Sequence, residues 1–328
     1  DVSLVGSEMC IRDRDNAMLL HRKINKGPNM KNLLSDLKDP LVGLPMLTPF
    51  DDNDQVDYSY AEFNIEKWNK TKADIFIIGT ASGEELYLSE DEKIKLVSTV
   101  SEAMNKDKIT CAGIDNPSIS ETLRLAENYE KSGASLLRIR YPRNESTIRQ
   151  YFKEVLKFSP LPVLLMHQGE PLNFGVAPKP VASPEVLGEI ASMDNVFGYV
   201  TEHDMRFEST VRKYVPSDKR FWICNGSMIL LGTLIGCNGT TTAFSNIWPD
   251  AMKELLKLGI DGKYNEAKQL QEQVKEIDNL MLPFLATGIK YCLKEMGYKG
   301  MVPRKPSKTL PEEIQLKIKD KLIEANLI

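Results

Sequence analysis

The sequence VFGYV at residues 196–200 is followed directly by TEHD at residues 201–204. The first five residues carry no charge and are mostly β-branched or aromatic, so they predict a short buried strand. The next four contain two carboxylates and one of the three histidines in the chain. In an α/β protein, polar side chains directly after a buried strand lie at the edge of the sheet where active sites occur.

The same pattern of a short apolar run and an amphipathic segment repeats on both sides of this stretch. The expected strands are 43–47, 74–79, 109–113, 136–140, 162–166, 196–200, 221–224 and 239–243. Eight strands with helices between them predict an α/β fold of the (β/α)8 TIM-barrel type, because each parallel strand needs a crossover helix. The competing architecture is a doubly wound open sheet, which usually has a G-x-G-x-x-G turn that this chain lacks.

Helix signals support this interpretation. Residues 92–104 carry apolar side chains three and four positions apart, and Ser89 precedes them as a helix cap. Similar patterns predict helices at 120–129 and 183–190. From residue 261 onward the pattern becomes purely helical, at 265–280, 283–296 and 311–325. We therefore expect a barrel over residues 30–260 and a C-terminal helical extension over residues 261–328.

The N-terminal residues differ from the rest of the chain. Residues 1–14, DVSLVGSEMCIRDR, have neither the apolar core nor the cleavage pattern of a signal peptide and resemble a translated vector tail. We expect residues 1–29 to be a non-native or disordered leader, with Met30 as the native start, and His21 therefore carries no weight.

Composition excludes several classes of function. Net charge is −4, from 42 Lys and Arg against 46 Asp and Glu, and no basic block is present, which disfavours nucleic acid and anionic membranes as partners. The five cysteines are widely spaced without a Cys-x-x-Cys motif, so neither a disulfide framework nor a zinc ribbon is indicated. The apolar runs are too short to cross a bilayer. A cytoplasmic location fits these features.

Three stretches together resemble a known family. They are LPMLTPF at 44–50, GTASGE at 79–84 with YLSEDE at 87–92, and the segment 236–246. In this order they resemble the dihydrodipicolinate synthase / N-acetylneuraminate lyase family of pyruvate-dependent class I aldolases, over about residues 41–310. The resemblance implies a (β/α)8 barrel with C-terminal helices, assembled as a homo-oligomer, a dimer or a homotetramer.

The resemblance also implies site residues. The family binds the substrate carboxylate at a turn after the second strand, which corresponds to Thr80 and Ser82, although this turn is one residue longer here. The alternative is that these hydroxyls only cap a helix. Tyr141 is the counterpart of a proton-relaying tyrosine after the fourth strand, unless it simply packs at a loop. The expected substrate-binding set is Thr80, Ser82, Arg140, Asn225, Ser245 and Asn246.

Arg138 and Arg140 are two residues apart on an expected strand, so they face the same side. If both point into the barrel, they favour an acidic substrate; if both point outward, they form salt bridges to helices. Arg140 is the better candidate for anion binding because it is nearer the carboxyl end of the strand.

The main departure from the family is on the sixth strand. The family has a Schiff-base lysine there, and in this chain Val200 occupies that position. Lys179 and Lys213 lie on segments that should not reach the barrel mouth, and Lys290 aligns with a family lysine of structural role. The sequence therefore predicts that the imine mechanism, which needs a neutral lysine amine, is missing.

Two histidines follow adjacent strands instead. His167 ends the fifth strand and His203 follows the sixth, beside Glu202. Together with Tyr141 they are the candidate catalytic residues, and His167, His203 and Glu202 are also a candidate ligand set for a divalent metal; no other cofactor is expected. The alternative is that these side chains are solvated, or that Glu202 and Asp204 only begin a helix.

Three functions remain open from the sequence. The first is a lyase or hydratase that binds a small carboxylate or 2-oxo acid at the barrel mouth and lacks a Schiff-base lysine. The second is a catalytically inactive family member that binds a ligand or another subunit. The third, a minor option, is a true aldolase whose lysine comes from elsewhere in the chain.

Overall fold

The computed structural model describes residues 34, 37–142, 145–168, 180–202 and 204–328. The chain divides into two compact units, Asp1–Leu37 and Lys38–Ile328. Only Leu34 and Leu37 of the first unit are described, so the predicted leader, 1–29, lies outside the described residues.

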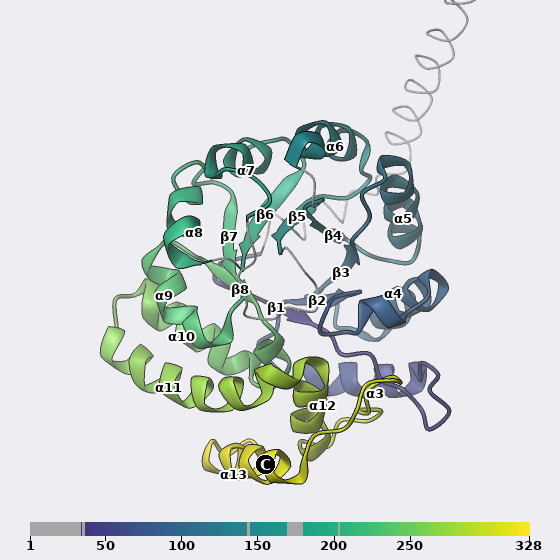
Figure 1. Cartoon of the computed structure of the whole chain (residues 1–328), viewed down its shortest axis with the longest axis vertical. Helices are drawn as coiled ribbons and strands as arrows, with labels where there is room; N and C mark the ends of the chain where they lie inside the picture. Colours follow the sequence, from purple (N-terminus) through teal and green to yellow (C-terminus); the bar gives the residue numbers. More distant parts are fainter. Residues whose placement is uncertain (1–33, 35–36, 143–144, 169–179, 203) are drawn as a thin grey trace, which may run out of the picture. The chain divides into compact units, whose positions relative to one another are not determined.

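The second unit contains a closed barrel of eight parallel strands in sequential order, β1 to β8 (Figure 1). The strands are β1 (Leu41–Pro45), β2 (Ile75–Ile78), β3 (Ile109–Ile114), β4 (Leu136–Arg140), β5 (Val163–His167), β6 (Val196–Thr201), β7 (Arg220–Ile223) and β8 (Gly239–Thr241). The barrel closes where Leu41 of β1 pairs with Gly239 of β8. The predicted (β/α)8 barrel is confirmed, and the open sheet is excluded.

The barrel strands are apolar because both of their faces are covered. All four residues of β2, IFII, and all six of β6, VFGYVT, are buried. Strands of a parallel barrel pack inward against one another and outward against helices, which favours continuous rather than alternating apolar runs. The eight expected strands were therefore visible in the sequence, and each observed strand overlaps its prediction.

Helices surround the barrel. They are α3 (Tyr58–Trp68), α4 (Glu90–Ala103), α5 (Ile119–Lys131), α6 (Glu145–Phe158), α7 (Pro184–Ala191), α8 (Met205–Val211), α9 (Ile229–Leu234), α10 (Pro249–Ile260), α11 (Tyr264–Met281), α12 (Leu285–Glu295) and α13 (Glu312–Glu324). Ser89 begins α4 as predicted. Its hydroxyl accepts a hydrogen bond from the Glu92 backbone N–H, and the Glu92 side chain accepts one from the Ser89 N–H.

The C-terminal helices α11, α12 and α13 pack together on one side of the barrel, beside α3 and α10 (Figure 1). The single helix predicted at 283–296 begins differently. A 3-10 turn, Leu282–Phe284, precedes α12, and Leu285 has a φ of 51° at the junction. Pro283 lacks a backbone N–H, so α11 cannot continue through this segment.

Within the described residues, no helix has both the length and the apolar character needed to span a membrane. The four described cysteines are free thiols, in agreement with the absence of a disulfide pattern.

Candidate functional site

A cavity opens at the carboxyl ends of the barrel strands. Its polar lining comes from several different strand ends and from α11 and includes Thr80, Ser82, Arg138, Arg140, Gln168, Glu202, Asn225, Thr241, Thr242 and Asp278. Residues that follow different strands meet here because parallel strands all end at the same face of the barrel. This face is where a small ligand would be held.

Two buried arginines on β4 form one wall of the cavity. Arg138 and Arg140 are 3% and 1% exposed, and both line the cavity, as the inward alternative predicted. Glu85, in the loop after β2, bridges them: its Oε2 lies 3.0 Å from Arg138 Nη2 and its Oε1 lies 2.6 Å from Arg140 Nη2. Arg140 also pairs with Asp115 at the end of β3. Two positive and two negative groups therefore balance one another in this wall.

The absence of a side chain at Gly113 leaves space for Arg138 and for the close approach of the Gly79 backbone. A Cβ on Gly113 of β3 would lie 2.0 Å from the Gly79 carbonyl oxygen and 2.5 Å from Arg138 Nη2. Only glycine permits this packing, in which Arg138 Nη2 donates a 2.6 Å hydrogen bond to that carbonyl. The Nε groups of Arg138 and Arg140 are buried and make no hydrogen bond within the described residues.

Glu202 directly follows β6 and faces the cavity. Its Oε2 is buried without a hydrogen-bond partner among the described residues. Burial raises the pKa of Glu202 to about 8, against the opposing effects of a hydrogen bond from Gln168 and the charges of Arg140 and Arg138. A carboxyl group in this state is protonated at neutral pH and can donate a proton or a hydrogen bond to a ligand.

The pKa of Glu202 makes stability depend on pH. The native state holds this proton up to about pH 8, whereas an unfolded glutamate loses it near its ordinary pKa of 4.5, so stability falls as pH rises between these values. The shift corresponds to about 4 to 5 kcal/mol. Because Glu202 as a whole residue is half-buried, solvent screens part of this effect, and about 2 to 3 kcal/mol is expected.

We expect Glu202→Gln to remove this loss of stability. On going from pH 5 to pH 9, the free energy of unfolding of the variant should rise by about 2 to 3 kcal/mol relative to that of the parent. Urea unfolding at both pH values measures the difference. Glu66→Gln, at an exposed position on α3, is the control. If the free energies of unfolding of the parent and Glu202→Gln differed by the same amount at both pH values, the pKa of Glu202 would not be raised.

The opposite wall of the cavity includes a residue from the C-terminal extension. Asp278 of α11 is 2% exposed and lines the cavity next to Asn225 and Gly226. The Ser227 hydroxyl donates a 2.7 Å hydrogen bond to Asp278 Oδ2. Burial raises the pKa of Asp278 to about 6, although the hydrogen bonds from Ser227 oppose the shift. The barrel and the extension thus contribute to one site.

The predicted substrate-binding residues divide into two groups. Thr80, Ser82, Arg140 and Asn225 line the cavity. Ser245 and Asn246 are buried beside it: Ser245 forms a capping box with Thr242, and the Asn246 side chain donates a 2.9 Å hydrogen bond to the Pro45 carbonyl. These last two hold the turn after β8, whose neighbouring residues reach the cavity.

Tyr141 and His167 lie in a separate buried cluster, on the helix-facing side of the barrel. His167 Nδ1 is 2.7 Å from the Tyr199 hydroxyl and 3.1 Å from Glu208 Oε1 of α8. The Tyr141 ring packs against Phe152 of α6, with centroids 4.8 Å apart. Neither Tyr141 nor His167 is among the described residues that line the cavity. The expected convergence of His167 with Glu202 is not seen, because alternate residues of a strand face opposite sides.

His203 lies outside the described residues, so its predicted role stays a prediction. The described part of the chain contains no group of three or more His, Cys, Asp or Glu side chains suited to a metal ion. Asp204 accepts hydrogen bonds from the Arg206 and Phe207 backbone N–H groups and begins α8, in line with the alternative interpretation of this cluster as a helix start.

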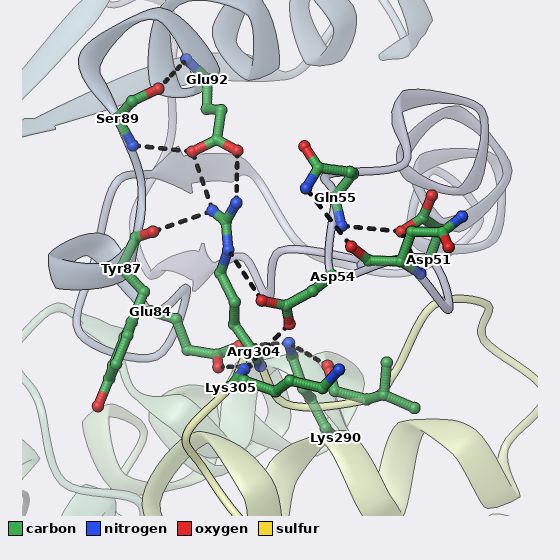
Figure 2. A network of polar contacts seen from close by, with 12 residues as sticks. Asp51, Asp54, Gln55, Glu84, Tyr87, Ser89, Glu92, Lys290, Arg304 and Lys305 are labelled. Atoms are coloured by element: carbon green, nitrogen blue, oxygen red, sulfur yellow. Dashed lines mark hydrogen bonds and ion pairs between the residues drawn. The ribbon is translucent and has the colours of Figure 1, made fainter.

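Val200 is fully buried on β6, two residues before Glu202, and therefore shares its inward face. No lysine is among the described residues that line the cavity. Lys213 is exposed. Lys290 of α12 is buried in an ion pair with Glu84 (Figure 2) and donates a 2.7 Å hydrogen bond to the Val302 carbonyl, and it is not among the described residues that line the cavity. Lys179 is outside the described residues.

Sequence reasoning missed several polar residues of the site, among them Glu85, Gln168 and Asp278. Glu85 follows the Gly-rich turn, but only the folded structure shows that it contacts two arginines. Gln168 stands directly after β5 and could have been selected by the same rule that selected His167. Asp278 gave no signal, because it lies on one face of an amphipathic helix and only tertiary packing brings it to the barrel.

Comparison with known proteins agrees with this architecture. Residues 42–325 match the profile of the Dihydrodipicolinate synthetase family. A 4-hydroxy-tetrahydrodipicolinate synthase from Prochlorococcus marinus (strain NATL2A) is 25% identical over 295 residues, which are 88% of this chain and 95% of that protein.

Two solved structures show the same fold. A monomeric dihydrodipicolinate synthase variant has a TM-score of 0.78 at 22% identity, covering 88% of this chain and 97% of that one. YagE, a prophage protein from E. coli K12 in complex with pyruvate, has a TM-score of 0.77 at 19% identity, covering 88% of this chain and 99% of that one.

Proposed function

Since the chain belongs to the Dihydrodipicolinate synthetase family, whose members act as lyases, we propose that it binds a small carboxylate or 2-oxo acid at the barrel mouth and acts as a lyase or hydratase without a Schiff-base lysine. The observation that carries this proposal is Glu202, a carboxyl group protonated at neutral pH, in a described cavity lining that has arginines but no lysine.

The charge of the cavity is compatible with an anionic ligand. Glu85 and Asp115 balance Arg138 and Arg140, and Glu202 is neutral at pH 7, so Asp278 is the one described lining residue that repels a carboxylate. The Ser82 and Thr80 hydroxyls supply hydrogen-bond donors. Donors to a carboxylate that lie out of water are worth more than exposed ones. The neighbour YagE was solved with pyruvate, a ligand of the proposed class.

Both proposed reaction types need proton transfer at the ligand. A lyase that cleaves a carbon–carbon bond and a hydratase that adds or removes water both pass through a carbonyl oxygen that gains negative charge. A neutral carboxylic acid beside that oxygen stabilises the charge by donating a hydrogen bond or a proton, as Glu202 is placed to do. Tyr141 and His167, which do not line the cavity, have no part in this proposal.

We propose a homo-oligomer, a dimer or tetramer, in the cytoplasm, with a small-molecule ligand as its main partner. The monomeric variant among the solved structures shows that this fold is also compatible with a single chain.

The absence of imine chemistry has a direct test. We expect incubation with pyruvate and sodium borohydride, followed by intact-mass measurement, to leave the protein mass unchanged, because Val200 has no nucleophile. A family enzyme that retains the lysine serves as the positive control. A mass increase corresponding to reduced pyruvate would contradict the proposal, and peptide mapping would identify the lysine.

Binding is measured separately, by isothermal titration calorimetry with pyruvate and 2-oxobutyrate. We expect saturable binding by the parent and weaker binding by Ser82→Ala, which removes one hydroxyl from the cavity. Binding without turnover of any 2-oxo acid would support an inactive family member instead.

A further inference from the structure

The cavity holds two carboxyl groups with different environments, supplied by distant parts of the chain. Glu202 comes from the end of β6, and Asp278 comes from α11 in the C-terminal extension. Neither makes an ion pair within the described residues. Both have a defined orientation, because Gln168 contacts Glu202 and Ser227 contacts Asp278. Paired carboxyl groups in unlike surroundings are a common arrangement for acid–base catalysis.

We propose that Asp278 and Glu202 enolise a 2-oxo acid in this cavity: Asp278 takes a proton from C3, and Glu202 gives a proton to the C2 carbonyl oxygen. The proposal rests on the ligand class proposed above and adds Asp278 as a second catalytic residue. It also assigns to the C-terminal extension a chemical role besides packing.

The surroundings of Asp278 suit a base. Its Oδ2 accepts a hydrogen bond from Ser227, which favours the charged form, while burial raises its pKa to about 6. It is therefore mostly ionised at pH 7 and more basic than an exposed aspartate. A Cβ on Gly226 would lie 3.1 Å from Asp278 Oδ2, so the glycine leaves space for the carboxylate. The titratable groups that face Asp278 are Cys224 of the strand-end loop and Cys292 of α12.

The surroundings of Glu202 suit an acid. Its pKa of about 8 keeps the proton in place at pH 7, and its buried Oε2 has no described partner to compete with a ligand. The charged groups that face it are Arg138 and Arg140 of β4, with Cys224 beside it on the neighbouring strand end. The two arginines stabilise the carboxylate that remains once the proton has moved to the ligand.

The proposed step is balanced and requires no oxidant. The C3–H bond breaks, its electron pair forms the C2=C3 double bond, and the proton goes to Asp278. The π electrons of the C2=O bond move to oxygen, which receives the Glu202 proton to give the enol. A neutral acid thus takes the place of an imine, because its proton neutralises the charge that develops on oxygen. Asp278 then passes the C3 proton to solvent, and a proton or deuteron from solvent takes its place at C3.

Proton exchange at C3 tests the proposal without knowledge of the full reaction. Pyruvate and 2-oxobutyrate are incubated with the full chain in deuterium oxide, and loss of the C3 proton signal is followed by NMR. We expect the parent to accelerate exchange over buffer, with a bell-shaped pH dependence whose limbs lie near 6 and 8. We expect Asp278→Asn and Glu202→Gln each to reduce the rate by about 100-fold or more.

Matched variants separate catalysis from folding. Asp261→Asn, an exposed aspartate at the end of α10, should leave the exchange rate unchanged. Ser227→Ala removes the hydrogen bond that favours ionised Asp278, so the acidic limb should move to higher pH while exchange persists. If Asp278 had only a structural role, Ser227→Ala would not shift the acidic limb of the pH profile.

The outcomes distinguish the two proposals. Exchange that Asp278→Asn leaves unchanged would overturn the role of Asp278 and leave the proposed function standing. A parent that exchanges neither probe would overturn the proposed function and the enolisation with it. Loss of exchange in Asp278→Asn, together with the shifted limb in Ser227→Ala, would support both.

Discussion

Lys290→Met is expected to lower the free energy of unfolding by about 3 to 5 kcal/mol, because it leaves the buried Glu84 carboxylate without its partner. Lys290 and Glu84 are fully buried or nearly so, and burial lowers the pKa of Lys290 to about 8 despite the opposing charge of Glu84. Figure 2 shows Lys290 and Glu84 within a polar network that joins the loop after β2 to the segment after α12.

Arg304 connects the rest of this network. Its guanidinium donates to both carboxylate oxygens of Glu92, at 2.9 and 2.8 Å, and its backbone N–H donates to Glu84 Oε1 at 2.9 Å. Glu84 has a φ of 60° at the start of the turn that carries Glu85. The network therefore holds in place both a backbone conformation that is unusual for glutamate and the residue that bridges Arg138 and Arg140.

Urea unfolding measures the effect, and two variants test its cause. Lys290→Met combined with Glu84→Gln should recover much of the loss, because no unpaired charge is then buried. Lys305→Met, an exposed lysine on the same segment, should change stability by less than about 0.5 kcal/mol. A loss below about 1 kcal/mol in Lys290→Met alone would mean that water or another group compensates Glu84.

Arg140→Met is expected to cost a similar amount, about 3 to 5 kcal/mol, and to abolish binding of 2-oxo acids. Arg140 is the charged partner shared by Glu85 and Asp115, so its loss leaves those carboxylates undercompensated in the cavity wall. These two carboxylates then repel an incoming carboxylate, and the positive charge of Arg140 no longer offsets that repulsion. Urea unfolding and calorimetric titration with pyruvate measure the two effects.

The charge origin of this loss has its own signature. The deficit of Arg140→Met should be smaller at pH 4 than at pH 7, because protonation removes the uncompensated charge. Arg149→Met breaks an ion pair with Glu189 whose side chains are 57% and 50% exposed, and it should cost no more than about 1 kcal/mol at either pH. A deficit that is independent of pH would assign the loss to packing of the arginine side chain.

The sequence alone determined the architecture of this protein. Parallel strands buried on both faces are short apolar runs, and each must be followed by a crossover segment, so the alternation was readable from the first strand to the eighth. The same rule predicted that strand ends carry the site, and Thr80, Ser82, Arg140, Glu202 and Asn225 do line the cavity. The family resemblance was also carried by local stretches of sequence.

Only the tertiary structure decided which polar residues face the cavity. His167 and Glu202 both stand at strand ends, but His167 is on the helix-facing side of β5 and contacts Tyr199 and Glu208 instead. A one-residue change in phase reverses the side that a strand residue faces, and strand limits cannot be read from sequence to that precision. Asp278 reaches the barrel mouth only through packing of α11, and burial, which sequence does not encode locally, sets the protonation of both Asp278 and Glu202.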